Sequence, residues 1–77
     1  MPASSPAQLG TVIRGLRKER SLTIEALAGE AGIHTTYLSE IERGYANPTW
    51  RIVGSIAEAL GVEISELARR AEKPARS

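Results

Sequence analysis

The sequence contains no cysteine and a single histidine, His34. Without cysteine the chain has no disulfide framework, and one histidine with no second ligand in reach does not make a zinc finger. Phenylalanine is missing and other aromatic residues are few, so we expect a core of Leu, Ile, Val and Ala side chains. No cofactor is expected.

Long hydrophobic runs are also missing. No stretch approaches the roughly 20 apolar residues needed to cross a bilayer, and the start of the chain lacks the basic and apolar regions of a signal peptide. We therefore expect a cytoplasmic protein without membrane contact.

Neither sign of charge is in large excess, because the formal net charge is +1. Composition alone thus gives no argument for a polyanionic partner. Positive charge is nevertheless concentrated in one short stretch, which contains Arg14, Arg17, Lys18 and Arg20.

A chain of 77 residues suffices for one domain with a modest core, so oligomerisation is a plausible further source of buried surface. We expect a flexible tail at residues 1–5, a single domain at residues 6–72 and a second flexible tail at residues 73–77.

Apolar residues recur at helical spacing in five segments, which predicts an all-α fold. Thr23 and Thr49 are the expected N-caps of the second and fourth helices, and Gly32, Gly44 and Gly61 are expected stops. The first helix is expected to follow a Ser5 cap. The predicted helices cover residues 6–20, 24–31, 35–43, 50–60 and 64–72.

The second and third predicted helices are short and are joined by a tight turn that contains Gly32. Two helices joined in this way form a helix-turn-helix, whose second helix reads the major groove of DNA. The segment from Thr35 to Gly44 is therefore predicted to meet duplex DNA.

Several short motifs occur together in a combination that resembles a known family. They are Ile13-Arg-Gly-Leu-Arg17, Leu22-Thr23, Leu27-Ala28, Ala31-Gly32-Ile33, Tyr37-Leu38-Ser39, Ile41-Glu42-Arg43-Gly44, Asn47-Pro48 and Ala59-Leu60-Gly61-Val62. From about Leu9 to Leu67 the chain resembles the lambda-repressor-like family, also called the Cro/C1-type or XRE helix-turn-helix family. The resemblance implies a compact five-helix DNA-binding domain.

Within this family, residues 34–39 and 41–44 are most similar to the controller proteins of restriction-modification systems. Those proteins are homodimeric transcription regulators, so the resemblance implies a homodimer that binds a palindromic operator. The bound protein would then block or recruit RNA polymerase. Small phage repressors and antitoxins carry the same domain and remain alternatives. An antitoxin would have a toxin as its main partner.

The first turns of a reader helix meet base edges, and these positions hold Thr35, Thr36, Ser39 and Glu40. A threonine hydroxyl can bond to a base and its methyl can touch thymine, whereas glutamate only accepts, as from cytosine N4. The alternatives are that both threonines merely start the helix after His34, that Ser39 is ordinary surface, and that Glu40 is solvated or paired with an arginine.

Phosphate contacts fix the register of a protein on DNA without reading sequence. In the family the loop after the reader helix follows the DNA backbone, which favours Arg43 and Asn47. Tyr37 belongs either to the core or to a phosphate contact, and its polar neighbours favour the phosphate. The full set of candidates is Thr23, Tyr37, Arg43, Tyr45, Asn47 and Arg51.

The resemblance also bears on two other positions. The family commonly has a glutamine that bonds to the DNA backbone where this chain has Ile24, so that contact is in doubt and Ile24 can pack inward instead. The resemblance further implies a salt bridge between Arg17 and Glu42 that ties the first helix to the reader helix, which makes Arg17 structural.

The remaining apolar residues suggest further contacts. Trp50 is expected to pack its ring at the start of the fourth helix. Gly54 lies inside that helix, at a cost of roughly 1 kcal/mol relative to alanine, and is explained either by close packing or as a tolerated flaw. The fifth helix has more apolar residues than a small core requires, namely Ile64, Leu67 and Ala68. Together with Ile52 of the fourth helix, these residues are expected to form a two-fold interface.

An enzyme is not predicted, because the sequence offers no nucleophile–base pair, no glycine-rich phosphate loop and no metal cluster. Glu40 and Glu42 are two positions apart on a helix and so do not face each other.

Overall fold

The computed structural model describes residues 6–72, and within that range the regular structure is entirely helical. The expected all-α, five-helix fold is confirmed, and each helix end lies within one residue of its predicted position. The tails expected at residues 1–5 and 73–77, and the Ser5 cap, lie outside the described residues. The helices are α1 (Pro6–Glu19), α2 (Ile24–Ala31), α3 (Thr35–Glu42), α4 (Trp50–Leu60) and α5 (Ile64–Glu72).

Local capping interactions mark where the helices begin and end. The Thr23 hydroxyl oxygen accepts a hydrogen bond from the Ala26 backbone N–H at 3.0 Å, and Thr49 caps α4 in the same way through the Ile52 N–H at 3.2 Å. α2 ends at Gly32, whose φ of 76° lies in the left-handed region that glycine adopts without strain. This glycine permits the short turn into α3.

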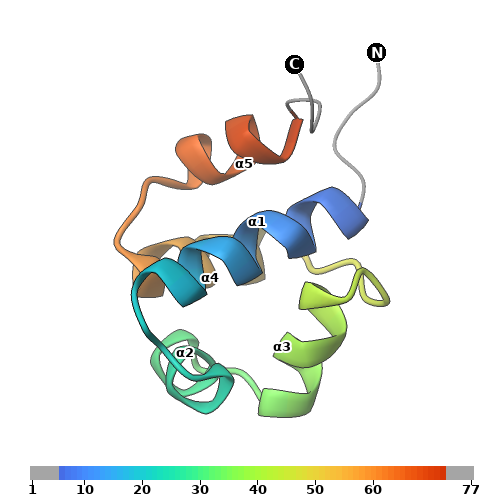
Figure 1. Ribbon diagram of the computed structural model, residues 1–77. Helices are drawn as coiled ribbons and strands as arrows, with labels where there is room; N and C mark the ends of the chain where they lie inside the picture. Colours follow the sequence, from blue (N-terminus) through green and yellow to red (C-terminus); the bar gives the residue numbers. More distant parts are fainter. Residues whose placement is uncertain (1–5, 73–77) are drawn as a thin grey trace.

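α1 crosses the molecule between its two ends. It contacts α5 on one side and α3 on the other, while α2 packs against α3 and α4. Figure 1 shows α5 at one end of the molecule and the α2–α3 pair at the opposite end. The helix-turn-helix unit is therefore held at one extremity, away from the last helix.

The core is aliphatic, as expected from the lack of phenylalanine. Every helix contributes to it, and the largest side chains that are fully buried are Ile13, Leu27, Leu38, Ile41, Ile56 and Leu67. Gly54 does not need to be glycine for packing, because an added Cβ would meet only the Ile64 Cδ1 atom at an ordinary 3.5 Å.

Two close backbone contacts fix α1 against the end of α3. A Cβ at Gly10 would lie 2.3 Å from the Ile41 carbonyl oxygen and 2.5 Å from that of Glu42. A Cβ at Gly44, which has a φ of 80°, would lie 2.9 Å from the Cα of Ala7. The first half of α1 thus rests directly on the backbone of the last turn of α3 and on Gly44 just beyond it.

Candidate nucleic-acid interface

α3 has an apolar inner face and a polar outer face. Leu38 and Ile41 point into the core and are fully buried. Thr36 and Glu40 are exposed, whereas Thr35 and Ser39 are half-buried. His34 occupies the N-cap position without a side-chain hydrogen bond to the helix. All four residues predicted to read bases therefore lie on one short helix whose opposite face is anchored.

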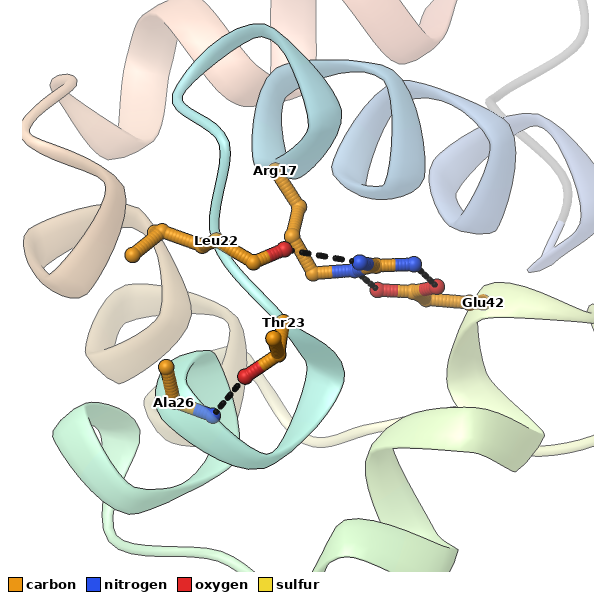
Figure 2. A network of polar contacts seen from close by, with 5 residues as sticks. All are labelled: Arg17, Leu22, Thr23, Ala26 and Glu42. Atoms are coloured by element: carbon orange, nitrogen blue, oxygen red, sulfur yellow. Dashed lines mark hydrogen bonds and ion pairs between the residues drawn. The ribbon is translucent and has the colours of Figure 1, made fainter.

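An ion pair joins α1 to the last turn of α3. The Arg17 guanidinium donates through Nε to Glu42 Oε2 at 2.7 Å and through Nη2 to Glu42 Oε1 at 3.0 Å. Its Nη1 donates to the Leu22 carbonyl oxygen at 2.9 Å, so the one side chain also holds the segment that leads into α2 (Figure 2). The structure thus contains the salt bridge that the resemblance implies.

This pair is largely shielded from solvent, because the two side chains are only 12% and 4% exposed. The hydrogen bond to the Glu42 carboxylate raises the pKa of Arg17 further above its ordinary value, against the opposing effect of burial. A buried carboxylate at the end of α3 is tolerated because its charge is paired and both oxygens are bonded. Arg17 and Glu42 therefore hold α3 against α1.

The start of α2 combines a cap with an apolar residue. Thr23 is exposed, and its hydroxyl accepts from Ala26 (Figure 2) while its own proton stays available to a partner. Ile24 is partly buried and packs against the core. Ile24 thus does pack inward, and Thr23 is the side chain there that can meet a phosphate.

The loop between α3 and α4 carries most of the predicted phosphate contacts. Arg43, Tyr45, Asn47 and Arg51 are all exposed. The Arg43 guanidinium lies 4.9 Å from the centre of the Tyr45 ring, a cation–π contact that orients the arginine. Tyr37, by contrast, is half-buried and packs against the core, so its ring is partly structural.

Two expectations about apolar residues are wrong. Trp50 does not pack its ring at the start of α4, since it is 64% exposed. Leu67 is not available to a two-fold interface, because it is completely buried in the hydrophobic core. The other three residues expected at that interface, Ile52, Ile64 and Ala68, are half-buried.

The basic cluster at residues 14–20, in and just after α1, is only partly available as a DNA surface. Besides Arg17, Arg20 is also engaged, because its Nε donates to the Leu60 carbonyl oxygen at the end of α4 at 2.7 Å. The sequence gives no signal for this contact, since the two residues are far apart along the chain. Arg14 and Lys18 remain exposed.

Within residues 6–72 no group of His, Asp and Glu residues is placed to hold a metal ion, and no helix there is long and apolar enough to cross a bilayer.

Comparison with known proteins identifies this arrangement. The family model described as Helix-turn-helix matches residues 13–67, which extend from the buried face of α1 into α5. The chain belongs to this helix-turn-helix family. The HTH-type transcriptional regulator DdrOP3 of Deinococcus deserti is 40% identical over 55 residues, with 71% of this chain and 43% of that protein covered. Control protein C.BamHI of Bacillus amyloliquefaciens is 39% identical over 59 residues, with 75% and 73% covered.

Solved structures of helix-turn-helix proteins share the fold. The restriction-modification controller protein C.AhdI from Aeromonas hydrophila superposes with a TM-score of 0.79 at 32% identity, covering 80% of this chain and 94% of that one. SinR, a master regulator for biofilm formation, was crystallised in complex with DNA and superposes with a TM-score of 0.72 at 33% identity, covering 77% and 95%.

Coverage of the relatives is uneven. The chain spans only 40% to 43% of the length of DdrOP3 and of two other curated repressors and regulators. The similarity to these three proteins therefore covers less than half of each of them and does not by itself assign their functions to this helix-turn-helix chain.

Proposed function

We propose that this chain is a sequence-specific transcriptional regulator that binds double-stranded DNA through α3. The observation that carries the proposal is the construction of α3, whose first turns present Thr35, Thr36, Ser39 and Glu40 while its other face is fixed to the core and to Arg17. A reader helix needs both properties, because base recognition requires polar side chains held in a defined position. The crystallisation of the similar protein SinR with DNA supports this assignment.

The proposal extends to a homodimer that acts in the cytoplasm on a palindromic operator, with two reader helices about 34 Å apart in successive major grooves. The half-buried apolar side chains of Ile52, Ile64 and Ala68 support an interface between copies. The likeness to C.AhdI and C.BamHI supports, more specifically, a controller of a restriction-modification system.

Selection of bound sequences from a random pool of duplex DNA tests the function. We expect one enriched motif with dyad symmetry and half-sites about 10 base pairs apart from centre to centre. A pool without enrichment contradicts the proposed function, and enrichment of a single half-site contradicts the dimer. In vitro transcription from the selected operator then separates a repressor, which excludes RNA polymerase, from an activator, which contacts it.

Two variants test the separate roles of reading and positioning. Thr36→Ala is expected to relax the preference at one base position by about 1 kcal/mol or more, because a base-edge contact is lost. Asn47→Ala is expected to weaken binding to all sequences nearly equally, because a phosphate contact carries no sequence information. Affinities for the selected operator and its single-base variants measure both effects, and an unchanged preference in Thr36→Ala rejects that residue as a reader.

A further inference from the structure

A hollow lies where α1, α2 and α3 meet. It is open to solvent, has a volume of about 230 Å³ and is lined by Arg14, Arg17, Ile24, Ser39, Glu42 and Arg43. This space suits a small group and is below the usual range for drug-sized ligands. Its walls combine two guanidinium groups from α1 and one from the residue after α3 with one hydroxyl.

The charges around this hollow do not cancel. Glu42 supplies the only carboxylate in the lining, and both of its oxygens already accept hydrogen bonds from Arg17. Arg14 and Arg43 are exposed, and neither pairs with a carboxylate within residues 6–72. The hollow therefore carries two uncompensated positive charges, one on α1 and one at the end of α3.

One side of the hollow is held in place by the Arg17–Glu42 pair. Arg17 is fixed by its three hydrogen bonds to Glu42 and Leu22, and Figure 2 shows its guanidinium between the start of α2 and the end of α3. The Arg43 guanidinium lies over the exposed Tyr45 ring. Because Arg17 is held before any partner arrives, this part of the hollow loses little conformational entropy on binding.

The position of the hollow indicates its occupant. Ser39 and Arg43 follow Thr35 at intervals of four along α3, so the wall of the hollow continues the stripe that begins at a predicted base reader. When a helix lies in the major groove, the phosphates that border the groove pass along its flanks. A positively charged hollow on one flank is thus placed to receive a backbone phosphate.

We propose that this hollow binds one phosphodiester group of the DNA backbone, with Arg14 as its principal ligand. Arg14 and Arg43 donate charge-assisted hydrogen bonds to the phosphate oxygens. The proposal rests on the proposed function and adds to it a contact from α1, outside the helix-turn-helix. Arg14 thereby fixes the depth and tilt of α3 in the groove without reading sequence.

The test compares Arg14→Gln with Lys18→Gln on the operator that sequence selection yields. Both variants remove one positive charge from an exposed position of the same helix, but only Arg14 lines the hollow. We expect Arg14→Gln to weaken binding about ten-fold per half-site, equally for all operator variants, and to reduce the slope of log K against log salt by about one. Lys18→Gln is expected to have a much smaller effect.

Replacing single phosphates by neutral methylphosphonates locates the contact. At one phosphate per half-site, neutralisation should weaken the unaltered protein but leave the Arg14→Gln variant nearly unaffected, because the partner is already lost. The proposal is overturned if Arg14→Gln and Lys18→Gln lose the same affinity. It is also overturned if the loss from Arg14→Gln and the loss from neutralising a phosphate are additive at every phosphate. If the unaltered chain binds no DNA at all, the proposed function fails and this site fails with it; salt-dependent binding that is insensitive to Arg14→Gln rejects the hollow alone.

Discussion

Two glycines of α1 differ sharply in their surroundings. A Cβ at Gly10 would collide with the carbonyl oxygens of Ile41 and Glu42, whereas a Cβ at Gly15 would meet nothing within 4 Å. We therefore expect Gly10→Ala to destabilise the fold by about 2 kcal/mol or more, because the backbone of α1 or of the end of α3 must shift to admit the methyl group. Gly15→Ala should stabilise it by roughly 0.5–1 kcal/mol, the usual gain in a helix interior. Urea denaturation measures both, and similar effects of the two substitutions contradict the close α1–α3 contact.

The pair of Arg17 and Glu42 gives a second prediction for individual residues. Glu42→Leu should cost about 3 kcal/mol of unfolding free energy, because it leaves a guanidinium largely buried without its counter-charge. The double variant Arg17→Met with Glu42→Leu should cost less than Glu42→Leu alone. A double-mutant cycle in urea provides the measurement, and simple additivity of the two single effects rules out the coupling.

Individual residues also mark the limit of what the sequence predicts. The Arg17–Glu42 pair could be expected because a family resemblance supplied both partners. The hydrogen bond from Arg20 to the Leu60 carbonyl could not, because nothing near either residue in the sequence indicates that α1 and α4 end side by side. The same holds for Trp50, whose exposure depends on where the α3–α4 loop places the start of α4.

At the scale of helices, prediction from the sequence succeeded because the signals are local. Caps such as Thr23 and Thr49 and the stop at Gly32 act within one helical turn, so their effect can be inferred from neighbouring residues. Which apolar side of a helix faces the core and which faces a partner is set by tertiary packing. The sequence therefore predicts an interface role for Leu67, whereas the structure buries it in the core.

α5 carries a surface ion-pair cluster that makes its stability depend on pH. Glu66 accepts a hydrogen bond from Arg70 Nε at 2.7 Å and also pairs with Arg69. The hydrogen bond from Arg70, aided by the charge of Arg69, lowers the pKa of Glu66 below its ordinary value. Because the folded pKa is the lower one, the stabilisation is complete above the unfolded value of about 4.3 and is lost as the pH falls through the folded value.

The variant Glu66→Gln isolates this contribution. We expect its thermal midpoint to lie below that of the unaltered chain at neutral pH and at low salt, and the two midpoints to converge in acid once Glu66 is protonated. Differential scanning calorimetry across this range measures the difference. A difference that persists unchanged in acid indicates that Glu66 acts through packing and not through charge.

At the scale of the whole molecule, the proposed DNA-binding surface and the proposed dimer interface lie apart. The α2–α3 unit lies at one end and α5 at the other (Figure 1), so a second copy can approach along α4 and α5 without covering the reader helices. For a dimer that neutralises about eight phosphates, the slope of log K against log salt should be near −7. Titration of the operator at several salt concentrations measures this slope. A monomer should give a slope about half as steep, and a slope near zero excludes binding to the DNA backbone.

The close contact of α1 with the end of α3 has a mechanical consequence for the complex. With Gly10 seated on the carbonyls of Ile41 and Glu42, and Gly44 against Ala7, the reader helix has no hinge at its C-terminal end. In the proposed dimer, each protomer then meets the duplex as a rigid template, and any mismatch in groove width or half-site phasing is accommodated by the DNA. For that dimer we expect easily bent base steps between the half-sites to favour binding although no side chain touches them.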